Sequence, residues 1–266
     1  MDVVMLIGVG LLTGVTTVLF GFGGGFVAVP VVVWADAALG ADAMRVATAT
    51  SALVMVVNAA FATSVTPRRV LAVLRGSTPL LVLLAAGATI GAFATRLAPP
   101  EPVRWAFVAY VALTLVDLLT RPGFLRPRAA AGEVRAARGP LPAVVGAPVG
   151  AVAAFLGVGG SVMTVPAMRR AGHSMHVATA LANPLTLAIA LPATAVSLGA
   201  AAVPKAVDAQ VFLVGLVDLR AAGALLLGAL PVIAVLRRRP PRIPDRAYAW
   251  TSVGLLAVVT IAMGLS

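Results

Sequence analysis

Long apolar stretches, separated by short polar or basic connections, run through almost the whole chain. They fall at roughly 3–20, 22–35, 45–66, 71–95 and 103–120, and then at roughly 141–157, 158–168, 175–200, 217–236 and 247–265. The stretches are long and lack the apolar–polar alternation of barrel strands, so they predict helices. A bilayer core about 30 Å thick needs about 20 apolar residues per spanning helix. The pattern therefore predicts an all-α polytopic membrane protein.

The stretch between the two groups of segments, RPGFLRPRAAAGEVRAARGP at 121–140, contains five Arg and three Pro. It offers little to bury and predicts a loop. We therefore expect a first transmembrane repeat over 1–120, a cytoplasmic linker over 121–140 and a second transmembrane repeat over 141–266. Residues 1–20 lack a basic region and an obvious cleavage site, so we expect a retained segment and not a signal peptide.

The two halves share a glycine motif that is closed by a proline. LFGFGGGFVAVP (19–30) and FLGVGGSVMTVP (155–166) match closely, and RVATATSAL (45–53) resembles HVATALANP (176–184) in either of two registers. Aligning 10–30 with 146–166 gives these identities: Gly10/Gly146, Gly14/Gly150, Gly21/Gly157, Gly23/Gly159, Gly24/Gly160, Val29/Val165 and Pro30/Pro166. The joint spacing indicates an internal repeat.

Composition strengthens the membrane assignment, because 61% of the residues are hydrophobic and 11% are charged. A soluble domain carries about 25% charged residues. The chain has no cysteine, which excludes disulfides and thiolate chemistry. The net charge of +11 comes from residues in short loops. It favours arginines that set membrane topology, and we expect no nucleic-acid partner.

The placement of the basic residues predicts how the repeats are oriented. If each half crosses the membrane an odd number of times, fifteen basic residues fall on one side and five on the other. Four crossings per half would divide them ten and ten. The positive-inside rule favours the uneven division. The repeats would then be inverted, with both termini outside, whether segments 22–35 and 158–168 span the membrane or re-enter it.

The glycine clusters are the strongest candidates for a binding site. Glycine lets the backbone approach a ligand closely, and the N–H groups at a helix start carry a partial positive charge. Two such ends meeting from opposite halves would bind an anion without a buried arginine. We expect Pro30 and Pro166 to act as hinges that bend or end the short second segments. The candidate binding residues are Gly23, Gly24, Gly25, Thr50, Ser51, Gly159, Gly160, Ser161, Thr179 and Asn183.

Each of these features also has a structural interpretation. Gly10-x3-Gly14, Gly87-x3-Gly91 and Gly146-x3-Gly150 have the spacing of close helix packing. Hydroxyl and amide side chains at Thr48, Thr50, Ser51, Asn58, Thr179 and Asn183 suit anion binding, helix capping or contacts between helices equally well.

Few other residues suggest chemistry. Asp117 is the one carboxylate placed well inside an apolar segment, and Arg121 lies four residues later, so a salt bridge is favoured over a proton relay. His173 and His176 lack partners at metal-ligand spacing, so no zinc site and no cofactor are expected.

The motifs GFGGGFVAVP with ATATSAL, and GVGGSVMTVP with HVATAL, resemble those of the TauE/SafE family of membrane transporters, which is named for sulfite export. The resemblance extends over nearly the whole chain. Ala180, where the family often has Ser, and Ser161, in place of Gly, depart from the pattern. The resemblance implies transport of sulfite, sulfonates or related organosulfur or carboxylate anions.

Together these observations predict a secondary transporter that moves a small anion across the bacterial inner (plasma) membrane by alternating access, with export as the expected direction. A passive anion channel is the alternative. No nucleophile–base pair or metal cluster lies within the apolar segments, so we do not expect an enzyme. Because the chain has no nucleotide-binding loop, ATP-driven transport would need another subunit.

Overall fold

The computed structural model describes residues 3–21, 23–121, 141–200, 211–238 and 243–265. Helices of the first half are α1 (Val3–Phe20), α2 (Gly25–Ala35), η1 (Ala37–Asp42), α3 (Ala43–Ser64), α4 (Arg68–Leu71), η2 (Ala72–Leu74), α5 (Thr78–Leu97) and α6 (Pro100–Thr120). Elements of the second half are η3 (Ala143–Val145), α7 (Gly146–Leu156), α8 (Ser161–Arg170), α9 (Met175–Leu198), β1 (Leu213–Val214), β2 (Val217–Asp218), α10 (Leu219–Arg238) and α11 (Asp245–Leu265).

Seven of the described helices are long and apolar enough to span a membrane: α1, α3, α5, α6, α9, α10 and the region Arg246–Gly264 of α11. The expected all-α polytopic membrane fold is confirmed at this level. In contrast, α2 and α7 have 11 residues each and α8 has 10. At 1.5 Å per residue, such helices cover about half of a 30 Å hydrocarbon core.

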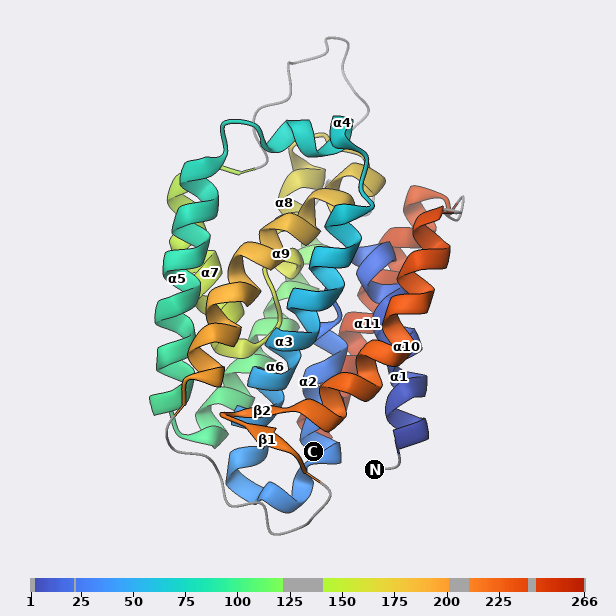
Figure 1. The fold of residues 1–266 in the computed structure, drawn as a ribbon. Coiled ribbons are helices and arrows are strands. Elements are labelled where there is room, and N and C mark those ends of the chain that lie inside the picture. The colour runs from blue at the N-terminus through green and yellow to red at the C-terminus, as the bar shows by residue number, and fades with distance from the viewer. Residues whose placement is uncertain (1–2, 22, 122–140, 201–210, 239–242, 266) are drawn as a thin grey trace.

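The short helices form hairpins. α2 turns back toward the end of the bundle where α1 begins, and α8 turns back toward the end where α7 begins (Figure 1). The first pair enters from the end that holds both chain termini. The second pair enters from the opposite end, beside α4 (Figure 1). The segments expected at 22–35 and 158–168 therefore reverse direction at the glycine clusters.

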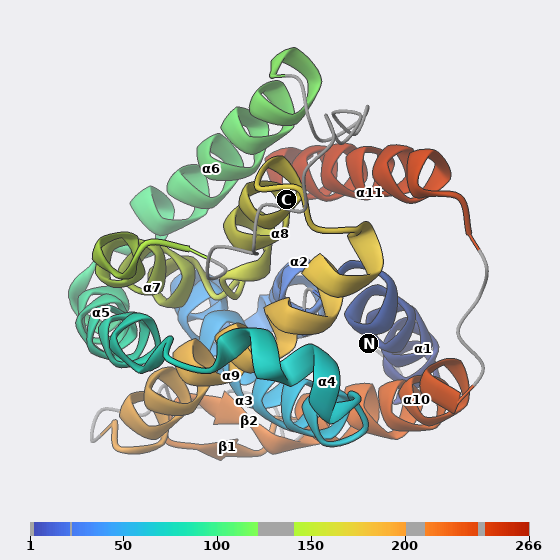
Figure 2. The same cartoon turned by 90° about the horizontal axis from the view of Figure 1, so that it is seen from above.

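The helix pairs pack across the two halves of the chain. The largest interfaces join α5 to α7, α1 to α10, and α3 to α9. Seen from above, α5 and α7 lie on one side of the central α3–α9 pair, α1 and α10 lie on the other, and α6 and α11 lie together at one edge (Figure 2). α3 is the most buried spanning helix and α6 the least buried.

Glycines allow the closest of these contacts. A Cβ at Gly87 or Gly91 in α5 would overlap the carbonyl oxygen of Ala147 or Ala151 in α7. A Cβ at Gly10 in α1 would overlap the carbonyl oxygen of Leu225 in α10. The small-residue spacings found in the sequence therefore serve close helix packing, as their structural interpretation predicted.

Several local expectations need correction. The segment expected at 71–95 is divided, because α5 begins only at Thr78 after the short elements α4 and η2. Of the two roles expected of Pro30 and Pro166, ending the helix is wrong, because the helices continue to Ala35 and Arg170. A bend at these prolines stays a prediction. Each proline is the sixth residue of its helix and removes one backbone donor, a local loss that the buried neighbouring turns tolerate. The antiparallel hairpin β1–β2 was not predicted.

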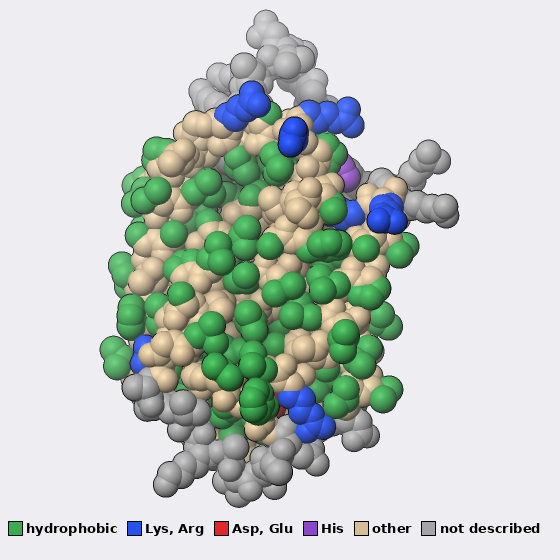
Figure 3. All heavy atoms as spheres, in the orientation of Figure 1, with side chains coloured by type: hydrophobic (Ala, Val, Ile, Leu, Met, Phe, Trp, Pro, Cys, Tyr) green, Lys and Arg blue, Asp and Glu red, His purple; other side chains and the backbone are tan. Residues whose placement is uncertain are grey.

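Basic side chains lie mainly at one end of the bundle. The described residues at the α4 end are Arg68, Arg69, Arg75, Arg121, Arg169, Arg170, Arg237, Arg238 and Arg246. Those at the opposite end are Arg45, Arg96, Arg104 and Arg220. Figure 3 shows a broad hydrophobic band between basic side chains at both ends. The other basic residues, and positions 122–140 of the linker, lie outside the described residues.

Candidate functional site

Two turns, which we call the glycine turns, join the short helices: one with Gly21, Gly23 and Gly24 between α1 and α2, and one with Gly157, Gly159 and Gly160 between α7 and α8. They meet in the centre of the bundle around Met55 of α3 and Thr186 of α9. A Cβ at Gly23 would lie 3.0 Å from Thr186 Cγ2 and 3.3 Å from Met55 Cγ. A Cβ at Gly159 would lie 2.9 Å from Met55 Sδ and 3.2 Å from Thr186 Cγ2. Both glycines have positive φ, 62° and 70°, which side chains disfavour. The structure thus places one glycine from each half against the same two side chains.

Direct contacts also join the two turns. A Cβ at Gly25 would lie 2.9 Å from the carbonyl oxygen of Gly157 and would overlap Met55 Sδ. The same carbonyl accepts a hydrogen bond from Ser51 Oγ in α3, at 3.0 Å. Ser51 and Gly157 are buried. Ser51 therefore holds the second-half turn against a first-half helix, which matches the expectation that hydroxyls join helices.

Several buried polar atoms beside the turns lack a hydrogen-bond partner within the described part of the chain. They are Ser161 Oγ, Thr164 Oγ1, Thr186 Oγ1, Asn58 Oδ1 and Asn183 Oδ1. All five residues are 0% exposed. A buried polar group without a partner costs about 1–3 kcal/mol, so such groups mark a place where a polar ligand would be stabilising.

The start of α8 adds backbone donors. Gly160 O accepts the N–H groups of Met163 and Thr164 at 3.1 and 2.9 Å, as in an ordinary first turn. No acceptor for the N–H groups of Ser161 and Val162 is present among the described residues. With the Ser161 hydroxyl, these amides form a set of donors at a helix N-terminus, where the dipole favours an anion.

The remaining candidate residues contact side chains and backbone atoms of the neighbouring helices. Gly24 faces Asn58 and Thr13, and Gly160 faces Ile189. Asn183 Nδ2 donates to the carbonyl oxygen of Thr179 at 3.2 Å.

Thr50 Oγ1 lies toward the β1–β2 end, where it accepts the N–H of Asp218 at 2.9 Å. The hydroxyls expected at helix starts do not cap their helices. α3 begins at Ala43, several residues before Thr48. At the start of α9, Ser174 Oγ accepts the N–H of Val177. The capping interpretation was therefore wrong.

Met55, Thr164 and Thr186 were not among the expected candidates, and anion binding was one of three roles left open for Asn58. Helical periodicity gives a signal that would have found Met55, Asn58 and Thr186. Ser51, Met55 and Asn58 follow the spacing i, i+4, i+7, and so do Thr179, Asn183 and Thr186. Residues with this spacing share one face of a helix. The two faces meet at the glycine turns.

Asp117 forms salt bridges at the end of α6. Its carboxylate lies 3.0 Å from Arg121 Nε and 2.6 Å from Arg170 Nη2 of α8. The favoured salt-bridge interpretation agrees with this geometry. Two other carboxylates, Asp36 directly after α2 and Asp218 at the end of β2, are buried, at 3% and 2% exposed.

Asp36 and Asp218 bring carboxyl groups from the two halves together at the end of the bundle that holds the termini. Burial, and then the neighbouring charge of Asp218, raise the pKa of Asp36 to about 7, while the charge of the amino terminus acts against them. Asp218 Oδ1 accepts the N–H of Arg220 at 2.8 Å. No cluster of three or more metal-ligating side chains is found within the described residues.

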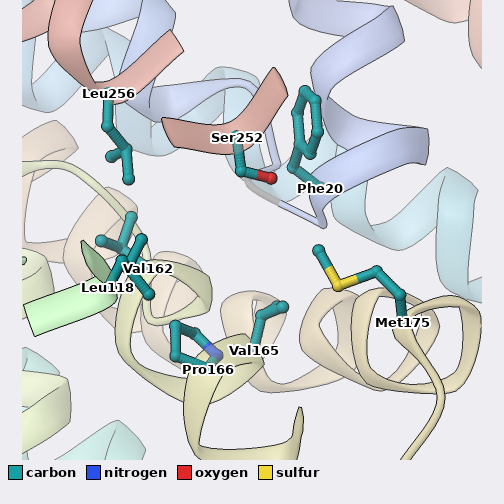
Figure 4. A pocket seen from close by; sticks show the side chains of 8 residues that line it. All are labelled: Phe20, Leu118, Val162, Val165, Pro166, Met175, Ser252 and Leu256. Carbon is teal, nitrogen blue, oxygen red and sulfur yellow. The ribbon is translucent and has the colours of Figure 1, made fainter. Parts of the chain in front are cut away.

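The structure has two recesses of different size. A cavity of about 10 Å³, room for about one water, is lined mainly by apolar side chains from α1, α6, α8, α9 and α11 (Figure 4). Ser252 supplies its one hydroxyl. A larger recess of about 310 Å³ lies near Trp34, Glu101 and Arg104. Neither of these two recesses is lined by Gly23, Gly159 or Met55, and all three residues are buried.

Comparison with known proteins gives one family match and no match to an individual protein. No curated protein and no solved structure matches the chain. Residues 6–263 match the family described as Sulfite exporter TauE/SafE. The matched region includes both glycine turns, five complete candidate spans and nearly all of the first and last spans. The match spans almost all of the 266 residues. The chain therefore belongs to the TauE/SafE family of sulfite exporters.

Proposed function

We propose that this chain is a secondary transporter that exports a small sulfur oxyanion, with sulfite or a short sulfonate as its substrate, across the plasma membrane. The observation that carries the proposal is the meeting of two glycine turns from opposite halves beside buried, unpartnered hydroxyls. Transporters commonly bind substrate near the midplane, where broken helices of two repeats meet. Family membership supports the class of transported ion.

In this proposal the two halves are inverted repeats, and corresponding contacts support that view. Gly21 lies against Thr179 and Ala182, while Gly157 lies against Thr48 and Ser51. These contacts correspond when Thr48 is aligned with Thr179, which favours one of the two sequence registers. Likewise, α1 packs on α10 as α7 packs on α5.

The binding site follows from the chemistry of the donors. An anion leaving water is stabilised only where other donors replace its hydration. The free N–H groups of Ser161 and Val162, together with the hydroxyls of Ser161 and Thr186, provide such donors without a buried cation. An empty site would then carry no net charge, which favours reorientation of the halves between substrate cycles.

Transport across proteoliposomes tests the function. We expect uptake of labelled sulfite that saturates with concentration and is competed by short sulfonates. Uptake that rises linearly with concentration would favour the passive channel. The absence of both sulfite and sulfonate flux, in protein that is shown to be inserted and monodisperse, would contradict the proposal.

A further inference from the structure

The side chain of Met55 occupies the space between the two glycine turns. Its sulfur lies 2.9 Å from the position of a Cβ at Gly159 and overlaps the position of a Cβ at Gly25. Its Cγ lies 3.3 Å from the corresponding position at Gly23. Met55 is 1% exposed, so this contact is closed to solvent. One thioether therefore fills the place where backbone from both halves converges.

Nothing about this side chain suits it to hold an anion. A thioether is a weak acceptor and has no proton to donate. Thr186 Oγ1 lies near the same glycine, Gly159, and has no partner within the described residues. Ser161 Oγ, at the start of α8, also has none there. Methionine is also unbranched, with three rotatable side-chain bonds, so it can leave a packed position more readily than a β-branched residue.

The corresponding position in the second half is chemically different. In the register that the glycine contacts support, Met55 of α3 corresponds to Thr186 of α9, and both touch Gly23 and Gly159. One position thus carries a large flexible apolar group, and the other carries a small hydroxyl. This asymmetry separates two tasks, closing the site and binding the ion.

We propose that Met55 is the gate and the size-determining residue of the central site: its thioether fills the empty site and moves aside when an oxyanion enters between the glycine turns. The inference rests on the proposed function and goes further by naming the residue that sets which sulfonates fit. The thioether limits the room left for the organic group of the substrate. Sulfite, which has no such group, needs the smallest displacement.

The test compares affinities of the purified full chain for sulfite, methanesulfonate and 1-propanesulfonate. In Met55→Ala, we expect the affinity for 1-propanesulfonate relative to sulfite to rise about 10-fold or more, since one methylene in an apolar pocket is worth about that factor. Met55→Leu conserves volume and should keep the ratio of the parent. Met44→Ala is the matched control, because Met44 lies on the same helix and is 5% exposed.

The variants distinguish failure of the gate from failure of the proposed function. If Met55→Ala binds sulfite and keeps the ratio of the parent, the inference is overturned. An equal change in Met44→Ala would also overturn it, since the effect would then not belong to the gate. Should Met55→Ala fail to fold, Met55→Val should show a smaller change in the same direction, and an unchanged ratio in that variant would overturn the inference. A parent that binds none of the three anions would overturn the proposed function, and this inference with it.

Discussion

Individual residues decide whether the two glycine turns are equivalent. Gly24 and Gly160 are aligned in the sequence repeat, yet their backbones differ. Gly24 has φ 87°, whereas Gly160 has φ −78° in the ordinary right-handed helical region. A Cβ at Gly24 would lie 2.9 Å from Asn58 Nδ2 and 3.2 Å from Thr13 Cβ. At Gly160 the nearest atom is the flexible end of Ile189, at 2.6 Å.

We therefore expect Gly24→Ala to be much more disruptive than Gly160→Ala. Left-handed backbone in a residue other than glycine costs about 1–3 kcal/mol. Gly24→Ala should lower the unfolding temperature and abolish sulfite binding, whereas Gly160→Ala should keep both close to the parent. Thermal unfolding with and without sulfite measures both effects. Equal losses in the two variants would mean that the difference in backbone conformation is unimportant.

Thr186 allows binding to be separated from stability. Its hydroxyl has no partner among the described residues. Thr186→Val should lower sulfite affinity by roughly 10-fold, as expected for loss of a hydrogen bond to a charged group. It should not lower the unfolding temperature.

Thr95→Val is the control, because the Thr95 hydroxyl donates to the carbonyl oxygens of Gly91 and Phe155. That variant should lose about 1 kcal/mol of stability and keep its affinity. Unchanged sulfite affinity in Thr186→Val would exclude this hydroxyl from the site.

Asp36 predicts a pH dependence of stability. Its pKa is raised from 3.8 to about 7, first by burial and then by Asp218. The folded chain therefore binds this proton more tightly than the unfolded chain. The stabilisation is complete below about pH 4 and is lost as pH rises through about 7. Its size is roughly 2–4 kcal/mol.

The measurement is thermal unfolding between pH 4 and 8. Asp36→Asn should flatten the decline that the parent shows over this range. A parallel decline in parent and variant would assign the pH dependence to other groups.

At the scale of helices, contacts between α5 and α7 depend on small residues. A Cβ at Gly87 would overlap the carbonyl oxygen of Ala147, so Gly87→Ala must push the two helices apart. We expect a loss of about 1–3 kcal/mol in stability, with little change in sulfite affinity. Gly254→Ala in α11 is the control, since among the described residues no atom beyond its own stretch of helix lies within 4 Å of the added Cβ. A larger effect on affinity than on stability would place α5–α7 packing within the binding mechanism.

The sequence predicted helices better than it predicted the site. Apolar length was enough for α1, α3, α6 and α9, because spanning helices need little else. It failed at 71–78, where apolar residues continue through α4 and η2 into a turn before α5. The glycine turns were found because their spacing repeats. Met55 was not found, because residue type alone does not distinguish a methionine in a site from one in a core, and the helix face that it shares with Ser51 and Asn58 was not traced.

Contacts between residues far apart in the sequence could not be predicted from the sequence either. Asp36 and Asp218 are separated by most of the chain, and their proximity depends on how α2 meets β2 and α10. Thr50 illustrates the same limit. Its place in a polar run predicted a binding role, but its hydroxyl accepts the N–H of Asp218. One-dimensional patterns give the face of a helix and do not give the partner of that face.

On the scale of the whole molecule, the distribution of charge predicts orientation. α4 and the ends of α6 and α8 lie at one end of the bundle, and the chain termini and the β1–β2 hairpin lie at the other (Figure 1). Among the described residues, arginines are concentrated at the α4 end. Because basic residues favour the cytoplasmic side, we expect this end to face the cytoplasm and both termini to lie outside.

Cysteine labelling can decide this orientation, because the chain has no native cysteine. Thr120 at the end of α6 and Ala38 in η1 are exposed and lie at opposite ends of the bundle. In intact cells, a membrane-impermeant thiol reagent should label Ala38→Cys and should label Thr120→Cys only after permeabilisation. Each variant replaces one exposed side chain, so each is the control for the expression and folding of the other. Labelling of Thr120→Cys from outside, with Ala38→Cys protected, would show that the orientation is the reverse of the expected one. It would then place the opening of the α7–α8 hairpin, with Arg169 and Arg170, on the outer surface.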